Sequence, residues 1–278
     1  MTQNSKQKSK YLGMREGDLK GKPYAKYWNP RMSDLPKRAY EAISRGPMAA
    51  ELFIGLDETQ DLLKTDCEKE ENGFALTADG GLLIAINTEM QGSTPDMVDW
   101  WFAWHSDQPE RYKLWHPKAH MHARWEDGKT SSDYKNPREI YQGRTSIVDE
   151  YVGSELGTYA IQFVAPSDLE LDKRVLEELS ATAICARVGF AGFPINFGYL
   201  IHLVQKTESG SIMRSRFWVG PPYASARPGN SWASPMVEIA KMVKAPNETN
   251  ARNLLVHCAE EMAHLASFLP ALYKDLGS

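Results

Sequence analysis

The sequence has few cysteines, and neither positive nor negative charge is in large excess. Each of these features argues against a class of protein. The three cysteines, Cys67, Cys185 and Cys258, lie far apart without a Cys-x-x-Cys pair. This spacing fits reduced, structural thiols better than a disulfide framework or a thiolate metal site. The formal net charge is -4, and no long basic stretch follows the lysine-rich first residues, which argues against a nucleic-acid partner. We therefore expect a small-molecule partner.

Long apolar runs and several common catalytic motifs are also missing. Residues 1–10 are polar and lysine-rich with no apolar run behind them, which predicts a flexible tail rather than a signal peptide. A cytoplasmic protein without a membrane partner is expected. The chain has no Gly-x-Ser-x-Gly, so it lacks the serine of the α/β-hydrolases. It also has no Gly-x-Gly-x-x-Gly or P-loop, so a nucleotide cofactor is not indicated.

Length and patterning predict one main domain with a small N-terminal addition. A chain of 278 residues with 42% hydrophobic content can bury one large core, or one core plus a small region. We expect a flexible tail over 1–18, a small helical region over 19–81 and the main domain over 82–278. Short amphipathic pieces at 35–43 and 49–63 favour helices in the second of these.

The main domain is predicted to combine strands with one long helix. The turn-forming residues 207–211 lie between two apolar runs and predict a hairpin. A late amphipathic segment, Asn250–Leu269, predicts a helix that Pro270 should kink or end. The expected strands lie within 82–87, 145–166, 181–190, 198–206 and 212–219. Strands followed by a long amphipathic helix suggest an α+β fold, with the helix packed across a curved antiparallel sheet.

The late helix carries a histidine and a carboxylate one turn apart. At 100° per residue, its apolar stripe consists of Leu254, Cys258, Met262, Leu265, Leu269 and Leu272. Glu261 projects within this stripe beside His257, whereas Glu260 points away from it. A carboxylate that faces a core is costly unless something pairs or coordinates it. A metal ion is one answer, although a His–Glu pair with this spacing is most often a side-chain hydrogen bond or a surface pair. A ferritin-like interpretation of Glu261 and His264 fails because that chemistry needs several such helices.

Four of the seven histidines fall in an aromatic segment, 100–122. If the chain is extended after Pro117, His120 and His122 project to the same side, and either one can reach a metal from a strand. Taken singly, His105, His116 and His122 are better explained by packing and hydrogen bonds in a pocket wall.

Two adjacent acids in a predicted strand form the last candidate. Alternation groups Glu150 with Val148 and Val152, and Asp149 with Ile147 and Tyr151, so periodicity alone leaves open which acid faces the interior. A strand histidine, a strand acid and the helical pair together form a nitrogen and oxygen ligand set. Such a set suits Zn²⁺ and is tolerated by Fe²⁺ or Mn²⁺.

Five ordered blocks lie between Asp96 and Pro270, and they read DMVDWWFAWH, ERYKLWHPKAH, SIVDEYVG, MRSRFWVG and HCAEEMAHLASFLP. Together they resemble the family of 2,4-diacetylphloroglucinol hydrolase and phloretin hydrolase. The resemblance implies a Bet v1-like helix-grip fold, in which a curved antiparallel sheet surrounds the long C-terminal helix and encloses a ligand cavity. It also implies zinc-dependent hydrolysis of the carbon–carbon bond between an acyl group and a phloroglucinol ring.

The same resemblance implies roles for particular residues. One zinc ion per subunit is expected on His120, Glu150, His257 and Glu261. Tyr112 is expected to contact substrate. The chemistry of the reaction, rather than the resemblance, suggests that Glu261 also acts as a proton shuttle.

The expected substrate pocket is lined by aromatic residues that include Trp115. Ala123 stands where the family has an asparagine, which removes a hydrogen-bonding group and implies room for a bulkier acyl arm such as that of phloretin. The alternative function is a non-catalytic carrier that binds aromatic polyketides or flavonoids in the same cavity. A homodimer is the assembly considered.

Overall fold

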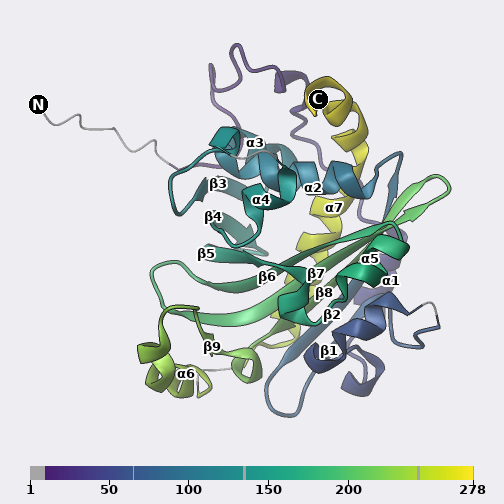
Figure 1. The fold of residues 1–278 in the computed structure, drawn as a ribbon, viewed down its shortest axis with the longest axis vertical. Helices are drawn as coiled ribbons and strands as arrows, with labels where there is room; N and C mark the ends of the chain where they lie inside the picture. Colours follow the sequence, from purple (N-terminus) through teal and green to yellow (C-terminus); the bar gives the residue numbers. More distant parts are fainter. Residues whose placement is uncertain (1–9, 65, 134–135, 243–244, 278) are drawn as a thin grey trace, which may run out of the picture.

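A nine-stranded antiparallel sheet forms the centre of the protein (Figure 1). The computed structural model describes residues 10–64, 66–133, 136–242 and 245–277. The strands are β1 (Gly73–Leu76), β2 (Leu82–Gln91), β3 (His120–Trp125), β4 (Thr145–Val152), β5 (Glu155–Val164), β6 (Ala181–Phe190), β7 (Ile195–Thr207), β8 (Gly210–Val219) and β9 (Ser225–Ala226). Their order is β1-β2-β8-β7-β6-β5-β4-β3, with β9 added on β7. The predicted hairpin is confirmed, because β7 and β8 pair directly on either side of Glu208 and Ser209.

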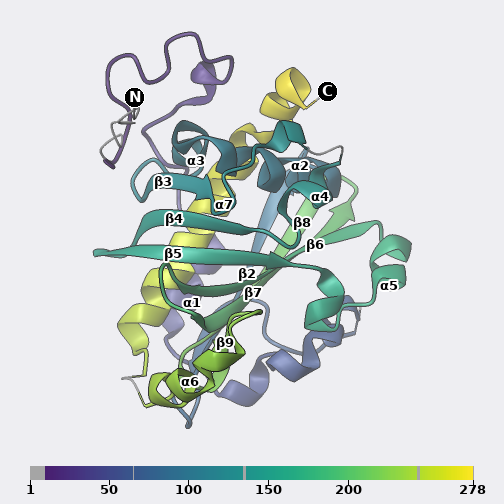
Figure 2. The same ribbon diagram turned by 60° about the vertical axis from the view of Figure 1, so that its left-hand side comes forward.

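The long helix α7 crosses one face of this sheet (Figures 1 and 2). The α-helices are α1 (Lys37–Arg45), α2 (Pro95–Trp104), α3 (Pro109–Trp115), α4 (Pro137–Tyr141), α5 (Lys173–Glu178), α6 (Ser234–Ala240) and α7 (Glu248–Leu276). Helices α2, α3 and α4 gather at one end of the molecule, while α6 and β9 lie at the opposite end (Figure 2). The predicted α+β fold, with a curved antiparallel sheet around a long C-terminal helix, is confirmed.

The alternating strand residues supply two apolar cores, one on each face of the sheet. Ile84 on β2 belongs to the core that includes Leu255 and Met262 of α7. Its neighbour Ala85 belongs to the second core, which includes Leu62 from a short 3-10 helix. Successive strand residues point to opposite faces. Because both faces are covered, apolar residues occupy both sides of these strands.

Helix α7 is longer than expected at its C-terminus. It runs through Leu276 with Pro270 inside it, so of the two expectations, a kink or an end at Pro270, the end is wrong. Proline removes one backbone hydrogen bond, but the turns beyond it are anchored by packing. Leu272 is fully buried, and Tyr273 meets Trp100 edge to face with ring centroids 5.4 Å apart.

The N-terminal residues extend the same structure. The region expected to be helical contains α1 and short 3-10 helices, and it ends in β1, which pairs with β2 as an edge strand. Residues 1–9 of the expected tail lie outside the described residues. Lys10 places Nζ 2.7 Å from Oδ2 of Asp149, and Lys113 donates to the carbonyl of Gly13 at 2.8 Å. None of the helices in the described ranges has the length and apolarity that a membrane crossing requires.

Candidate metal centre

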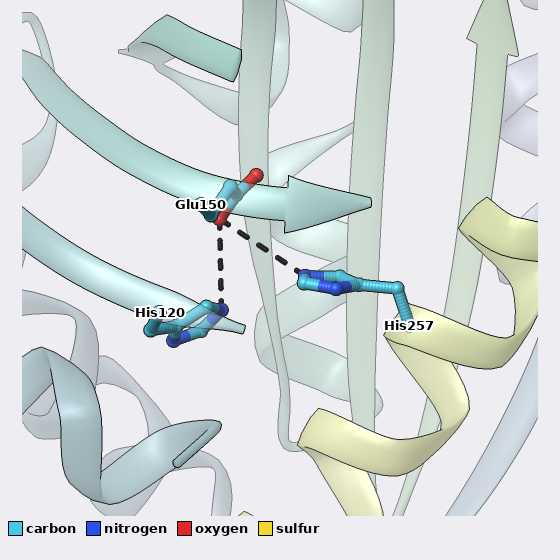
Figure 3. A group of neighbouring side chains, drawn as sticks. All are labelled: His120, Glu150 and His257. Carbon is cyan, nitrogen blue, oxygen red and sulfur yellow. Dashed lines mark ion pairs between the residues drawn. The ribbon is translucent and has the colours of Figure 1, made fainter. Parts of the chain in front are cut away.

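Two adjacent strands and the long helix bring three candidate ligands together (Figure 3). The antiparallel register of β3 and β4 places His120 opposite Glu150, and α7 supplies His257. Oε2 of Glu150 lies 3.5 Å from Nε2 of His120 and 4.0 Å from Nε2 of His257. One ligand atom from each residue lies within 4.8 Å of the others. This separation is compatible with a shared metal ion.

The fourth expected ligand, Glu261, points into the same cluster. Its Oε2 lies 3.4 Å from Nε2 of His120 and 3.7 Å from Nε2 of His257. Glu260 points elsewhere, and its carboxylate lies 3.4 Å from Nε2 of His116. The apolar stripe predicted that Glu261 faces the interior and that Glu260 points away, and the two side chains lie in this way.

The backbone orients His120 so that one ring nitrogen faces the cluster. Nδ1 of this buried ring lies 3.1 Å from the carbonyl oxygen of Tyr112. A carbonyl only accepts hydrogen bonds, so Nδ1 carries the proton and Nε2 keeps a free lone pair. Nε2 is buried and makes no hydrogen bond within the described residues. A bare, preoriented imidazole nitrogen of this kind is typical of a metal ligand.

Burial leaves the cluster short of positive charge. It raises the pKa of Glu150 to about 7 and holds that of Glu261 well above its usual range, where the nearby Glu150 adds to the effect. Burial also lowers the pKa of His257 to about 3 and keeps that of His120 well below normal, so the two imidazoles are neutral. Two neutral nitrogens and two carboxylates form a donor set that suits a divalent ion such as zinc. The residues present therefore fit the expected metal.

Tyr112 connects the candidate ligands to the cavity. Its hydroxyl donates a short hydrogen bond to Oε2 of Glu150. Its ring stacks on His120 with centroids 3.8 Å apart and planes 4° apart. Burial and the neighbouring carboxylate of Glu150 raise its pKa well above the usual value, so the phenol keeps its proton.

A cavity of about 830 Å³ opens from the cluster between the sheet and α7. Tyr112 and Trp115 line it, as expected, together with Glu150, His257 and Glu261. Phe102, Val148, Phe163, Leu200 and Phe217 are among its apolar walls, and His105 and His202 add polar atoms.

Ala123 does not line this cavity. It is buried in the apolar core and pairs across the strands with Val148, which does line the cavity. Any influence of Ala123 on substrate size must therefore act through its neighbour.

The structure also separates the two adjacent acids on β4. Asp149 accepts a hydrogen bond from Thr158 at 2.6 Å and pairs with Lys10. His122 joins this group, with Nδ1 3.8 Å from Asp149, and lies outside the candidate metal ligands. Glu150 is thus the acid that faces the cavity.

Two further histidines lie near the site. His116, which was interpreted as packing and hydrogen-bonding in a pocket wall, stacks on His257 with centroids 4.9 Å apart and planes 15° apart. His202 was not singled out from the sequence. His202 lies in the cavity wall, where Nδ1 is 2.8 Å from Oγ of Ser215. Burial lowers the pKa of His202 to about 3. In the sequence, His202 could have been noticed as a single polar residue within the apolar run of β7.

Solved structures that match this chain have low sequence identity to it. Ara h 8.0201 covers 69% of this chain and 99% of its own length, with a TM-score of 0.39 and 11% identity. A norcoclaurine synthase from Thalictrum covers 64% of this chain and 96% of its own length, with a TM-score of 0.32 and 13% identity.

Similarity to curated proteins extends over most of the sequence. A 2,4-diacetylphloroglucinol hydrolase of Pseudomonas protegens is 34% identical over 271 residues, which cover 94% of this chain and 86% of that protein. The phloretin hydrolase of Eubacterium ramulus is 29% identical over 258 residues, which cover 91% of this chain and 89% of that protein. The family model described as the DAPG hydrolase PhiG domain matches residues 53–274. On this evidence, and as its five sequence blocks predicted, the chain belongs to the DAPG hydrolase family.

Proposed function

We propose that this protein hydrolyses the carbon–carbon bond that joins an acyl group to a phloroglucinol ring. The main support is the buried, charge-deficient cluster of His120, Glu150, His257 and Glu261 in the wall of a large aromatic cavity. The family relationship supports the same reaction, because relatives named for diacetylphloroglucinol and phloretin hydrolysis align with almost the whole chain.

Zinc is the proposed metal, with one ion per subunit. His120, Glu150, His257 and Glu261 would hold it through two nitrogens and two carboxylates. When bound, a divalent ion of this kind supplies Lewis acidity toward an acyl carbonyl and toward water. The hydrogen bond from His120 to the Tyr112 carbonyl keeps that imidazole in the tautomer that binding requires.

Protons in the reaction are assigned to two side chains. Cleavage of the bond leaves electron density on a ring carbon, which must gain a proton. A phloroglucinol ring helps, because its keto tautomer makes that carbon tetrahedral before the bond breaks. We assign this proton to Glu261, which lies in the cavity wall beside His120 and His257 and would exchange between binding the metal and carrying the proton. The hydroxyl of Tyr112 donates to Glu150, so in this proposal it accepts a hydrogen bond from a ring hydroxyl, or turns from Glu150 to donate to the acyl carbonyl.

The cavity walls account for recognition of a flat ring. Phe102 and Trp115 meet edge to face, with centroids 5.4 Å apart, and both line the cavity. Aromatic walls bury the apolar faces of a planar substrate, and a few polar groups set its orientation. His202 provides such a group in this cavity, whereas both ring nitrogens of His105 already lie within hydrogen-bond distance of Trp101 and Ser106.

A panel of substrates separates this proposal from a non-catalytic carrier. Purified protein with its metal content measured is incubated with diacetylphloroglucinol, monoacetylphloroglucinol and phloretin. The hydrolase releases one carboxylic acid for each deacylated phenol, and chelation of the metal stops the release. Binding of all three compounds without acid release from metal-loaded protein would favour the carrier and overturn the proposal.

A further inference from the structure

The cavity is longer than a ring with a small acyl group requires. Its wall includes α7 residues from Asn250 to Glu261, a stretch of roughly 16 Å at the rise of an α-helix. Its volume of about 830 Å³ falls in the upper part of the range of ~300–1,000 Å³ that is usual for small-molecule sites. The candidate ligands His257 and Glu261 lie toward one end of this stretch, so most of the length extends away from the chemistry.

The far end of the cavity is apolar. It is bounded by β6 and β7 residues, such as Phe190 and Ile195, and by Met236 and Ile239 of α6. Some of its polar groups already have partners: the side-chain oxygens of Asn247 and Asn250 accept each other's backbone N–H groups, and the Tyr199 hydroxyl donates to Ser225 at 3.1 Å. Glu155 also lines the cavity and is exposed. Because most of the lining at this end is apolar, it suits hydrocarbon better than a hydrogen-bonding group.

The apolar wall at this end is only partly covered by the protein itself. Phe190 packs against Phe197 with centroids 4.6 Å apart and against Tyr159 at 5.6 Å. Phe190 is nevertheless 50% exposed, and Ile239 is 66% exposed. Apolar surface that stays exposed beside a binding cavity marks a place where an apolar ligand completes the packing.

We propose that the preferred substrate is an acylphloroglucinol with a long, unbranched alkyl acyl arm that follows α7 from the metal centre to α6. This inference rests on the proposed function. Asn253, which lines the cavity one turn from His257, is a polar group along the path. The alternative is an acyl arm with a terminal phenol, as in phloretin, which would be preferred if the Asn253 side chain determines which arm is bound.

Chain length provides the direct test. The value of kcat/KM is measured for acetyl-, hexanoyl- and decanoylphloroglucinol, with phloretin as the comparison. Each buried methylene raises kcat/KM by up to about fourfold, so decanoyl should exceed both acetyl and phloretin by well over tenfold. Equal values across the series, or a preference for phloretin, would overturn the inference while leaving the proposed function intact. Failure to hydrolyse any of the four would instead reject the proposed function.

A matched pair of variants locates the arm. Met236 lines the cavity on α6, whereas Glu238 on the same helix is exposed and pairs with Lys241 at 2.9 Å. Met236→Trp fills the far end, so it should remove the gain in kcat/KM from the acetyl to the decanoyl substrate. Glu238→Trp should keep the full gain. Loss of the gain in both variants, or in neither, would contradict the proposed path.

Binding without turnover gives a second measurement. Decylphloroglucinol lacks the acyl carbonyl and cannot be hydrolysed, so its Kd can be measured on metal-free protein. We expect it to bind at least tenfold more tightly to wild type and to Glu238→Trp than to Met236→Trp. Equal Kd values in folded Met236→Trp and wild type would place the arm elsewhere.

Discussion

Two clusters of charged residues in this protein shift the pKa of a glutamate in opposite directions. Glu71 accepts hydrogen bonds from Arg214 at 3.0 Å and from Arg216 at 2.5 Å, and these guanidinium groups lower its pKa to about 2. Glu150 has only neutral histidines and Tyr112 as its partners among the described residues, and burial raises its pKa to about 7.

The difference separates a structural ion cluster from a binding site. The Glu71 cluster contains its own counter-charges, so it is complete in the folded chain. The Glu150 cluster holds carboxylates without a fixed cation, an arrangement that is costly unless a bound ion completes it. Perturbed carboxyl groups in a cavity are typical of functional sites. Variants in each cluster should therefore fail in different ways.

The largest effect is expected from His257→Ala. Loss of this ligand should remove the metal and, because the metal supplies several kcal/mol of transition-state stabilisation, lower kcat by at least about 1,000-fold. Elemental analysis and kcat are measured on the same sample. His122→Ala is the control, since His122 lies near Asp149 outside the ligand set. Retention of both metal and activity in His257→Ala would show that the helix pair is structural.

Glu71→Gln should affect stability and leave the metal in place. Removing the carboxylate leaves Arg216 buried without its partner, which should cost about 2–3 kcal/mol of unfolding free energy once partial exposure is considered. Glu89→Gln is the control, because Glu89 pairs with Arg38 at the surface and should cost less than about 0.5 kcal/mol. Urea unfolding and metal content are measured for both. Metal loss in folded Glu71→Gln would break the distinction between the clusters.

The same cluster predicts an acid dependence of stability. The pKa of folded Glu71 is lowered from 4.5 to about 2, so its contribution is complete above pH 4.5 and is lost as the pH falls toward 2. In Glu71→Gln this part of the decline should be missing. Unfolding free energies that fall in parallel for the two proteins across this range would contradict the assignment.

Tyr112→Phe should separate metal binding from turnover. Its hydroxyl contacts Glu150 and the cavity, so its loss should lower kcat/KM by roughly 10- to 100-fold, the value of one buried hydrogen bond. The metal content should stay at one per subunit, because the carbonyl that orients His120 is unchanged. Loss of metal from this variant would assign Tyr112 to the ligand set instead.

The smallest effect is expected from Ala123→Asn. Ala123 pairs with Val148 in the core rather than lining the cavity, so the substitution acts on the acyl pocket indirectly. We expect the ratio of kcat/KM for phloretin over diacetylphloroglucinol to fall by less than about tenfold. An unchanged ratio would mean that Ala123 does not influence acyl selection.

Helical periodicity and turn chemistry located much of the fold and part of the site. The hairpin between β7 and β8 and the bounds of β6 were predicted closely, because both faces of these strands are apolar and their turns are strong signals. The apolar stripe on α7 selected Glu261 over Glu260 because the helical period is regular. The remaining ligands rested on the resemblance to a family rather than on pattern.

The sequence by itself determined the long amphipathic helix, the main strands and the choice of Glu261, since these depend on short-range periodicity. Alternation along β4 could not decide between Asp149 and Glu150, because both faces of this strand are covered. The family resemblance indicated Glu150, and the tertiary structure places Glu150 in the cavity wall. It also continued α7 past Pro270 and placed His116 against His257. These outcomes depend on strand register and on packing between distant segments, which local sequence does not record.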